Sequence, residues 1–327
     1  MDRDALVQAI DRAVLEPVVR RALDSEVAVV ENLRATPLGG GIGAELGGGV
    51  PIRFTGTAVD RGAARPWSVV LKVLRRPSAA GGVSQPDPGH QFYWRREAHL
   101  YASGLLDGLP AGLATPRCYG VDEGADGVRL WLEDVAEPAG VRWSLARYGE
   151  AARHLGRFNG AYLTGRSLPE EPWLCRDLLR WREPAVAPFW AHLPDTEEAP
   201  RVRRGWPGDL AARARRLWAE RDRFLAALDD LPRVLCHGDA ARRNLCARDV
   251  DGATETVAID WGQSGPQPIG TDAAHLVANS VMWARDREPA NLPALAGPCF
   301  AGYLAGLEAG WTGAAEVARL SFAATLA

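Results

Sequence analysis

The segment VLCHGDAARRNL, residues 234–245, places an aspartate and an asparagine at a fixed spacing after a short apolar run. Asn244 precedes a predicted strand, 245–248, which pairs through an Asp-Gly turn with a second strand that ends at Asp260. The oxygen-bearing side chains of Asp239, Asn244 and Asp260 are therefore expected to converge. Asn244 and Asp260 suit a hard cation such as Mg²⁺, which leaves Asp239 to accept a proton or hydrogen bond from an alcohol. Taken singly, HGD is also typical of a capped turn and IDW of a strand end.

Two further charged residues lie in segments that are otherwise apolar. Lys72 is the only lysine in the sequence, and it interrupts the strand-like run SVVLKVL. Glu97 shares one face of a helix predicted over 91–105 with Leu100 and Tyr101, so its carboxylate needs a partner. Lys72 is the candidate partner. A solvated edge lysine and a glutamate at the rim of the helix face are the alternatives.

A glycine-rich run, LGGGIGAELGGG, joins two predicted strands at residues 38–49. It does not match the dinucleotide-binding pattern GxGxxG, and the sequence contains no Gly-Lys pair of a Walker A loop. The glycines could let backbone amides approach a ligand closely, and Gly40, Gly41 and Gly43 are the candidates for contact with phosphates. A flexible surface turn is the other reading.

Composition indicates a globular protein of 327 residues, 47% hydrophobic and 24% charged, with a net charge of −3. Because the charges are mixed along the chain, neither nucleic acid nor a membrane surface is an expected partner. Five widely spaced cysteines without a CxxC pair favour reduced thiols and a cytoplasmic location. No apolar run is long enough to span a membrane. The oligomeric state is not readable from these features.

The order of predicted elements changes part-way along the chain. Strands are expected at 27–38, 50–59, 67–74, 116–122 and 128–134, with one helix among them. Apolar residues recur at helical spacing farther along. We therefore predict an α+β protein with an amino-terminal lobe at 1–135, an antiparallel sheet with one helix, and a mainly helical lobe at 136–327.

The motifs HGDAARRN at 237–244 and IDWG at 259–262, with Lys72 and Glu97 upstream, closely resemble the aminoglycoside phosphotransferase family. The resemblance covers roughly residues 28–275 and implies a protein-kinase-like, two-lobed fold. It also implies ATP, with GTP as the alternative, and Mg²⁺.

The resemblance assigns a role to each matching residue. Asp239 corresponds to the catalytic aspartate, and Asn244 and Asp260 correspond to the metal ligands. Lys72 matches the lysine that contacts the α- and β-phosphates, and Glu97 matches its ion-pair partner.

Four other residues receive supporting roles from the same resemblance. His237 would shape the catalytic loop, and Asp272 would brace it. In the segment that joins the lobes, Glu133 would offer a backbone carbonyl and Val135 a backbone amide to the adenine edge.

The catalytic loop departs from the usual family pattern because Arg242 and Arg243 stand beside the expected catalytic aspartate. They could steady a phosphate or an anionic acceptor. Solvated loop arginines are the alternative.

The predicted reaction is ATP-dependent phosphorylation of a hydroxyl on a small molecule, such as an aminoglycoside, another antibiotic or a sugar-like alcohol. A protein acceptor is disfavoured because only eleven residues separate Asp260 from Asp272, too few for a long activation segment. Antibiotic resistance and ordinary metabolism are equally compatible with the sequence. A catalytically inactive kinase-like scaffold that binds a ligand is the alternative function.

Overall fold

The computed structural model describes residues 3–39, 51–77, 84–124, 127–135, 137, 142–192, 209–282, 292–308, 311, 313 and 315–326. The chain forms two compact units whose segments alternate along the sequence. The first unit comprises residues 1–141, 171–174 and 244–263, and the second comprises 142–170, 175–243 and 264–327. Within the described ranges, no helix combines the length and the apolar character needed to cross a bilayer.

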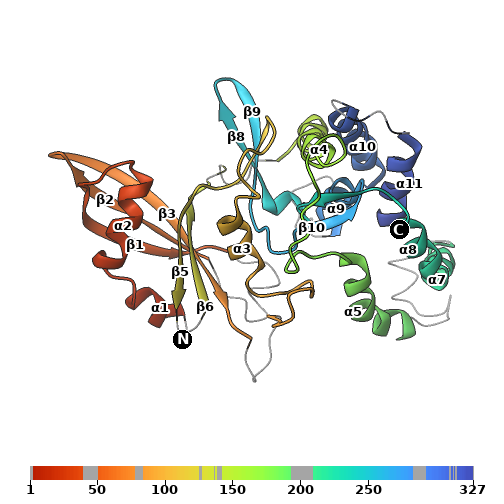
Figure 1. The fold of residues 1–327 in the computed structure, drawn as a ribbon, viewed down its shortest axis with the longest axis horizontal. Helices are drawn as coiled ribbons and strands as arrows, with labels where there is room; N and C mark the ends of the chain where they lie inside the picture. The colour runs from red at the N-terminus through yellow and green to blue at the C-terminus, as the bar shows by residue number, and fades with distance from the viewer. Residues whose placement is uncertain are drawn as a thin grey trace. The chain divides into compact units, whose positions relative to one another are not determined.

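An antiparallel sheet of five strands, in the order β1-β2-β3-β6-β5, dominates the first unit (Figure 1). Its strands are β1 (Val29–Pro37), β2 (Ile52–Asp60), β3 (Ala63–Arg75), β5 (Cys118–Gly124) and β6 (Gly127–Glu133). β-Branched and aromatic residues at alternate positions favour this half-buried sheet. The strands that the sequence predicts near these positions are therefore present, and β3 begins four residues earlier than expected.

Helices pack against both faces of the sheet. Successive side chains of a strand point alternately to one face and to the other. The helices α1 (Arg3–Gln8) and α2 (Arg12–Ala22) bury one face, where Leu71 and Trp131 join the larger apolar core. The helix α3 (Arg96–Ser103) supplies Ala98 to a smaller cluster with Leu130 on β6. Because side chains alternate along a strand, Lys72 points to the face opposite Leu71, the face that α3 covers.

The α3 helix is shorter than the predicted 91–105. It starts at Arg96, after turns at 91–95 that form an isolated bridge between Gln85 and Tyr93. It ends at Gly104, whose left-handed φ of 76° is typical of a helix C-terminus. Periodicity could not reveal the early turns because backbone carbonyls in residues 88–91 bind the side chain of the first residue of α3, described below.

The predicted hairpin at the end of the catalytic motif is present in the first unit. β8 (Leu245–Val250) pairs antiparallel with β9 (Ala253–Ala258), and the short β4 (Leu113–Ala114) adds a parallel strand to β9. Asp251 and Gly252 both have positive φ, as the tight two-residue turn requires.

The second unit is mainly helical, which confirms the predicted α+β class with an antiparallel amino-terminal sheet and a helical carboxy-terminal part. Its helices are α4 (Leu145–Gly160), α5 (Leu178–His192), α7 (Leu210–Ala219), α8 (Arg221–Asp229), α9 (Thr271–Met282), α10 (Leu292–Glu308) and α11 (Ala315–Leu326). The unit also contains two short strands, β7 (Arg233–Cys236) and β10 (Gly265–Pro268), which pair with each other in antiparallel fashion.

The backbones of α4 and α10 touch where glycines of the two helices face each other. A Cβ on Gly302 would overlap the carbonyl oxygen of Gly149, and a Cβ on Gly156 would overlap that of Tyr303. Farther along α10, Gly297 has open space around it. The crossing therefore requires glycine at some positions of α10 and not at others.

We expect Gly302→Ala to destabilise the protein by about 2 kcal/mol, because an added methyl group forces tightly packed backbones apart. Gly297→Ala on the same helix is the matched control and should stabilise by up to about 1 kcal/mol, since alanine is the better helix former. Urea unfolding followed by circular dichroism measures both changes. Equal effects of the two substitutions would contradict the close helix contact.

Candidate functional site

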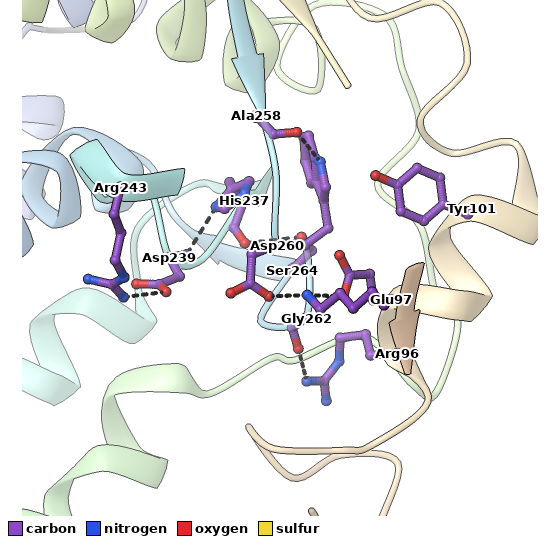
Figure 2. Close-up of polar contacts among 12 residues, drawn as sticks. Arg96, Glu97, Tyr101, His237, Asp239, Arg243, Ala258, Asp260, Gly262 and Ser264 are labelled. Carbon is purple, nitrogen blue, oxygen red and sulfur yellow. Dashed lines mark hydrogen bonds and ion pairs between the residues drawn. The ribbon is translucent and has the colours of Figure 1, made fainter. Parts of the chain in front are cut away.

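The only lysine of the chain lies between two carboxylates in the first unit. The Lys72 Nζ lies 2.5 Å from Glu97 Oε2 and 2.7 Å from Asp260 Oδ1. Glu97 is nearly fully buried, whereas about half of the Asp260 side chain is exposed. Glu97 and Asp260, both labelled in Figure 2, come from separate elements of the unit. The structure therefore brings together three residues that the sequence places far apart.

Charge and burial act against each other in this cluster. Burial alone would lower the pKa of the Lys72 ammonium, but Asp260 and Glu97 outweigh it and raise that pKa above its usual range. Burial raises the pKa of the Glu97 carboxyl; the ammonium opposes this rise, and Asp260 adds to it. Lys72 therefore stays charged, and its charge is what makes a buried Glu97 tolerable.

Asp260 has a conformation that non-glycine residues rarely adopt. Its φ is +64°, two residues after the end of β9. The next residue, Trp261, is fully buried and donates its indole N–H to the carbonyl of Ala258 at 2.8 Å. The backbone of Trp261 also lowers the pKa of the Glu97 carboxyl, against the effect of burial. Packing and hydrogen bonds therefore hold the turn in a conformation that costs free energy by itself.

Sequence reasoning missed Arg96, the residue before Glu97. It is fully buried, and its guanidinium donates to the carbonyl of Gly262 at 2.8 Å (Figure 2). The helical pattern offered one signal, since Arg96 neighbours the charged residue that was singled out. The acceptors themselves are backbone groups, which leave no mark on the sequence.

Asn244 lies opposite the residue before Asp260. Its carbonyl accepts the amide of Ile259 at 2.9 Å, and the pairing continues from Leu245 opposite Ala258. A carboxamide and a carboxylate thus come from the two ends of one hairpin. Among the described residues, no cluster of three His, Cys, Asp or Glu side chains could hold a metal alone. The donor set fits Mg²⁺, which binds proteins through one or two oxygens and fills its other positions with phosphate and water.

In the second unit, a buried carboxylate holds the HGD segment. Asp272 Oδ2 accepts the amide of His237 at 2.9 Å, and its Oδ1 accepts the amide of Gly238 at 3.0 Å. Gly238 has a φ of +83°, which favours glycine. The His237 ring is buried, and its Nδ1 accepts the amide of Asp239 at 3.2 Å (Figure 2). The hydrogen bonds of three successive backbone amides, those of residues 237–239, therefore position Asp239.

Both oxygens of Asp239 have partners in the same unit. Arg243 donates to Oδ2 at 2.8 Å, and Asn279 on α9 donates to Oδ1 at 3.0 Å. The neighbouring Arg242 stacks its guanidinium over the ring of Trp143 at 4.2 Å. Thus one of the two loop arginines pairs with the expected catalytic aspartate, and the other packs on an aromatic ring.

A polar network behind Asp272 was not anticipated from the sequence. Asn159 on α4 donates to Asp272 Oδ2 at 3.2 Å and to the carbonyl of Leu235 at 2.8 Å. Tyr303 on α10 donates to Asn159 Oδ1 at 2.8 Å and accepts the amide of Gly270. These groups are buried, and two helices therefore fix the carboxylate that holds the HGD segment.

The remaining predicted nucleotide contacts are less defined. The Glu133 amide donates to the carbonyl of Arg117, and its side chain pairs with Arg248 at 2.8 Å. Val135 follows β6 and is half-buried. Gly40, Gly41 and Gly43 lie outside the described residues.

Comparison with known proteins identifies the family. The profile of the phosphotransferase enzyme family (APH) matches residues 72–317. The chain belongs to this family. The enzyme is therefore a small-molecule kinase of the APH family, as the motifs predicted. Among curated proteins, none matches the chain significantly.

Solved structures with similar folds include several antibiotic kinases. An aminoglycoside-3'-phosphotransferase of type VIII has 22% identity and a TM-score of 0.49, with 89% of this chain and 92% of that chain covered. The amicoumacin kinase hAmiN in complex with AMP-PNP, Ca²⁺ and Ami has 13% identity and a TM-score of 0.47, with 94% of this chain and 80% of that chain covered. An aminoglycoside phosphotransferase from Alicyclobacillus acidocaldarius subsp. acidocaldarius DSM 446 has 15% identity and a TM-score of 0.48, with 90% of this chain and 78% of that chain covered.

We expect Lys72→Met to destabilise the protein by on the order of 3 kcal/mol near neutral pH, because it leaves a buried carboxylate without its cation. Burial keeps the pKa of Glu97 above its unfolded value of about 4.3. A group with a raised folded pKa loses its contribution to stability as pH rises, so the penalty should be smaller at pH 5 than at pH 8. Urea unfolding at both pH values measures it.

The double variant Lys72→Met/Glu97→Gln is the control, because it has no carboxyl group at position 97 to titrate. Its stability loss relative to Glu97→Gln should depend little on pH. A pH-independent penalty in Lys72→Met alone would show that the ion pair is not buried as described.

Proposed function

We propose that this enzyme transfers the γ-phosphate of ATP to a hydroxyl of a small molecule, such as an antibiotic or a sugar-like alcohol. The observation that carries the proposal is the placement of Lys72 between Glu97 and Asp260. A compact ammonium held there offers a fixed positive charge for phosphate oxygens, while Asp260 keeps an exposed side chain for a cation. ATP is the proposed donor and GTP the alternative.

Each residue has a role in this proposal. Lys72 binds the α- and β-phosphates, and Glu97 orients it. Asn244 and Asp260 would hold Mg²⁺, which when bound neutralises charge on the phosphate oxygens. The proposed hinge contacts are the backbone groups of Glu133 and Val135, and the loop with Gly40, Gly41 and Gly43 is the proposed phosphate cover.

Asp239 is proposed as the catalytic residue. The acceptor oxygen forms a bond to the γ-phosphorus, the bond from that phosphorus to the bridging oxygen of ADP breaks, and the hydroxyl proton passes to Asp239. Because the transition state is loose, the proton moves late, and the aspartate mainly orients the hydroxyl. The hydrogen bonds from Arg243 and Asn279 support this role, because they fix the direction of the carboxylate.

The division of labour along the chain is also a proposal. Residues 1–135 would mainly bind the nucleotide, and residues 136–327 would carry the catalytic aspartate and the acceptor site. The segment 244–263 belongs to the second stretch but is part of the first compact unit. It would contribute the metal ligands to nucleotide binding.

The charges around Asp239 favour a neutral or anionic acceptor over a polycationic aminoglycoside. Arg243 pairs with the carboxylate, and the half-buried Arg182 on α5 contacts His275 at 3.3 Å. Burial lowers the pKa of Arg182, and the negative charge of Asp239 partly offsets that effect. Two guanidinium groups therefore interact with the carboxylate of Asp239. Their positive charges would repel a ligand that carries several ammonium groups.

Phosphate transfer from labelled ATP with Mg²⁺ to a panel of alcohols tests both parts of this proposal. The panel contains macrolides, nucleosides, sugars, hydroxy acids and aminoglycosides. We expect turnover with a neutral or anionic member and weaker turnover with aminoglycosides. Preference for an aminoglycoside would contradict the charge argument alone, whereas ATP binding without any transfer would favour an inactive scaffold. Transfer to an antibiotic would add a role in resistance.

We expect Asp239→Asn to lower kcat by about 10²–10⁴ while ADP affinity stays unchanged, because the amide cannot accept the proton. Asp230→Asn, at an exposed position after α8, is the matched control and should match the wild type. Steady-state kinetics and calorimetric titration with ADP measure the two quantities. Unchanged turnover in Asp239→Asn would rule out the assigned role.

A further inference from the structure

Arg96 is buried without any exposed surface, and all its donors are used. Its Nε donates to the carbonyl of Trp173 at 2.6 Å. The Nη1 group donates to the carbonyls of Gln91 and Gly262 at 2.9 and 2.8 Å. The Nη2 group donates to those of Pro88 and His90 at 3.0 and 2.6 Å. A guanidinium has five N–H groups, so this one is fully satisfied by five backbone carbonyls.

These carbonyls belong to three stretches of the first unit. Three come from the turns before α3, one comes from the 171–174 segment, and one comes from the turn that follows Asp260. A single side chain therefore joins segments that are separated by up to 174 positions in the sequence. Unlike the apolar contacts of the sheet, these bonds are directional, so they fix the segments in orientation as well as in distance.

The energetics make arginine hard to replace at this position. A buried cation loses its hydration, and only a complete set of hydrogen bonds offsets that cost. Lysine has three donors arranged around one atom, so it can serve at most three of the five carbonyls and leaves at least two buried acceptors unsatisfied.

Arg96 and Glu97 act on the same turn from consecutive positions of one helix. Glu97 holds Asp260 through Lys72, while Arg96 holds the carbonyl of Gly262. The two ends of the 260–262 turn are thus tied to the first two residues of α3. Asp260 needs such support because its left-handed φ is unfavourable.

We infer that Arg96 is a positioning residue that fixes Asp260 for metal-assisted nucleotide binding by holding the 260–262 turn to the start of α3. The inference rests on the proposed role of Asp260 as a metal ligand. It goes beyond that role because it assigns part of the metal affinity to a side chain that never reaches the metal. Outer groups that orient a ligand typically contribute 10–100-fold to metal affinity.

Arg96→Lys is the test variant, and Arg95→Lys is its matched control. Arg95 is the preceding residue; it is partly exposed, pairs with Glu123 and lies over the ring of Trp94. The same chemical change is thus made at two adjacent positions, one buried against the turn and one outside it. Thermal unfolding sets an assay temperature at which both variants are folded.

Two measurements are made on the whole protein. The first is amide hydrogen exchange of peptides that cover 258–264, without metal or nucleotide. The second is the ADP dissociation constant with and without Mg²⁺, which separates the gain due to the metal from binding of the nucleotide itself. We expect Arg96→Lys to speed exchange in this peptide and to reduce the Mg²⁺-dependent gain about tenfold, with ADP affinity in the absence of metal little changed.

The outcomes are distinct. If the wild type shows no Mg²⁺-dependent gain, the proposed function fails. If the wild type shows the gain and Arg96→Lys retains it, the inference alone is overturned. A loss of ADP affinity that is equal with and without Mg²⁺ would mark a general structural role and also overturns it. If Arg96→Lys does not fold, Arg96→Gln, which has no charge to bury, takes its place; failure of both to fold would make Arg96 a folding determinant and overturn the positioning role.

Discussion

The ammonium of Lys72, held between two carboxylates, is the interaction on which the first unit depends. It joins the sheet, through β3, to the helix α3 and to the turn after β9. The three charges sum to one excess negative charge, and the carboxylate of the cluster that solvent reaches is the half-exposed Asp260 rather than the buried Glu97. An arrangement of this kind satisfies its buried member internally and keeps its outer member able to attract a further cation.

In the second unit, hydrogen bonds hold a polar loop, the HGD segment, at the end of the buried strand β7. Asp272 accepts two successive amides of the HGD segment. Asn159 donates to Asp272, and Tyr303 donates to Asn159. Carboxylate acceptors for backbone amides are strong and directional. The loop therefore owes its shape to residues of α4, α9 and α10. The backbone of Asp239 is positioned mainly by these hydrogen bonds to the neighbouring residues.

The sequence predicted those parts of the candidate site that follow local rules. The Asp-Gly turn between β8 and β9 and the alternation along β3 depend on near neighbours, so the hairpin and the facing of Lys72 could be expected. Family motifs then supplied the order of the charged residues, while their chemical roles stay predictions. The start of α3 was placed five residues too early, because the carbonyls of the preceding turns bind Arg96 instead of continuing a helix. The Asn159 network was equally invisible, since its partners are set by tertiary structure. Arg243, by contrast, stands four residues after Asp239, and the sequence indicated their proximity but not their pairing.

The chain passes five times from one compact unit to the other, and the β8–β9 hairpin returns to the first unit after a long stretch spent in the second. The gene therefore has no single point at which the units can be cut apart. A recombinant piece that stops near residue 135 would contain Lys72 and Glu97 but would lack Asp260 and the carbonyls of Trp173 and Gly262. Such a piece would leave Lys72 and Glu97 without the second carboxylate of their cluster. It would also leave the Arg96 guanidinium with only three of its five backbone acceptors. Isolated expression of the sheet region is thus a poor route to a nucleotide-binding module from this protein.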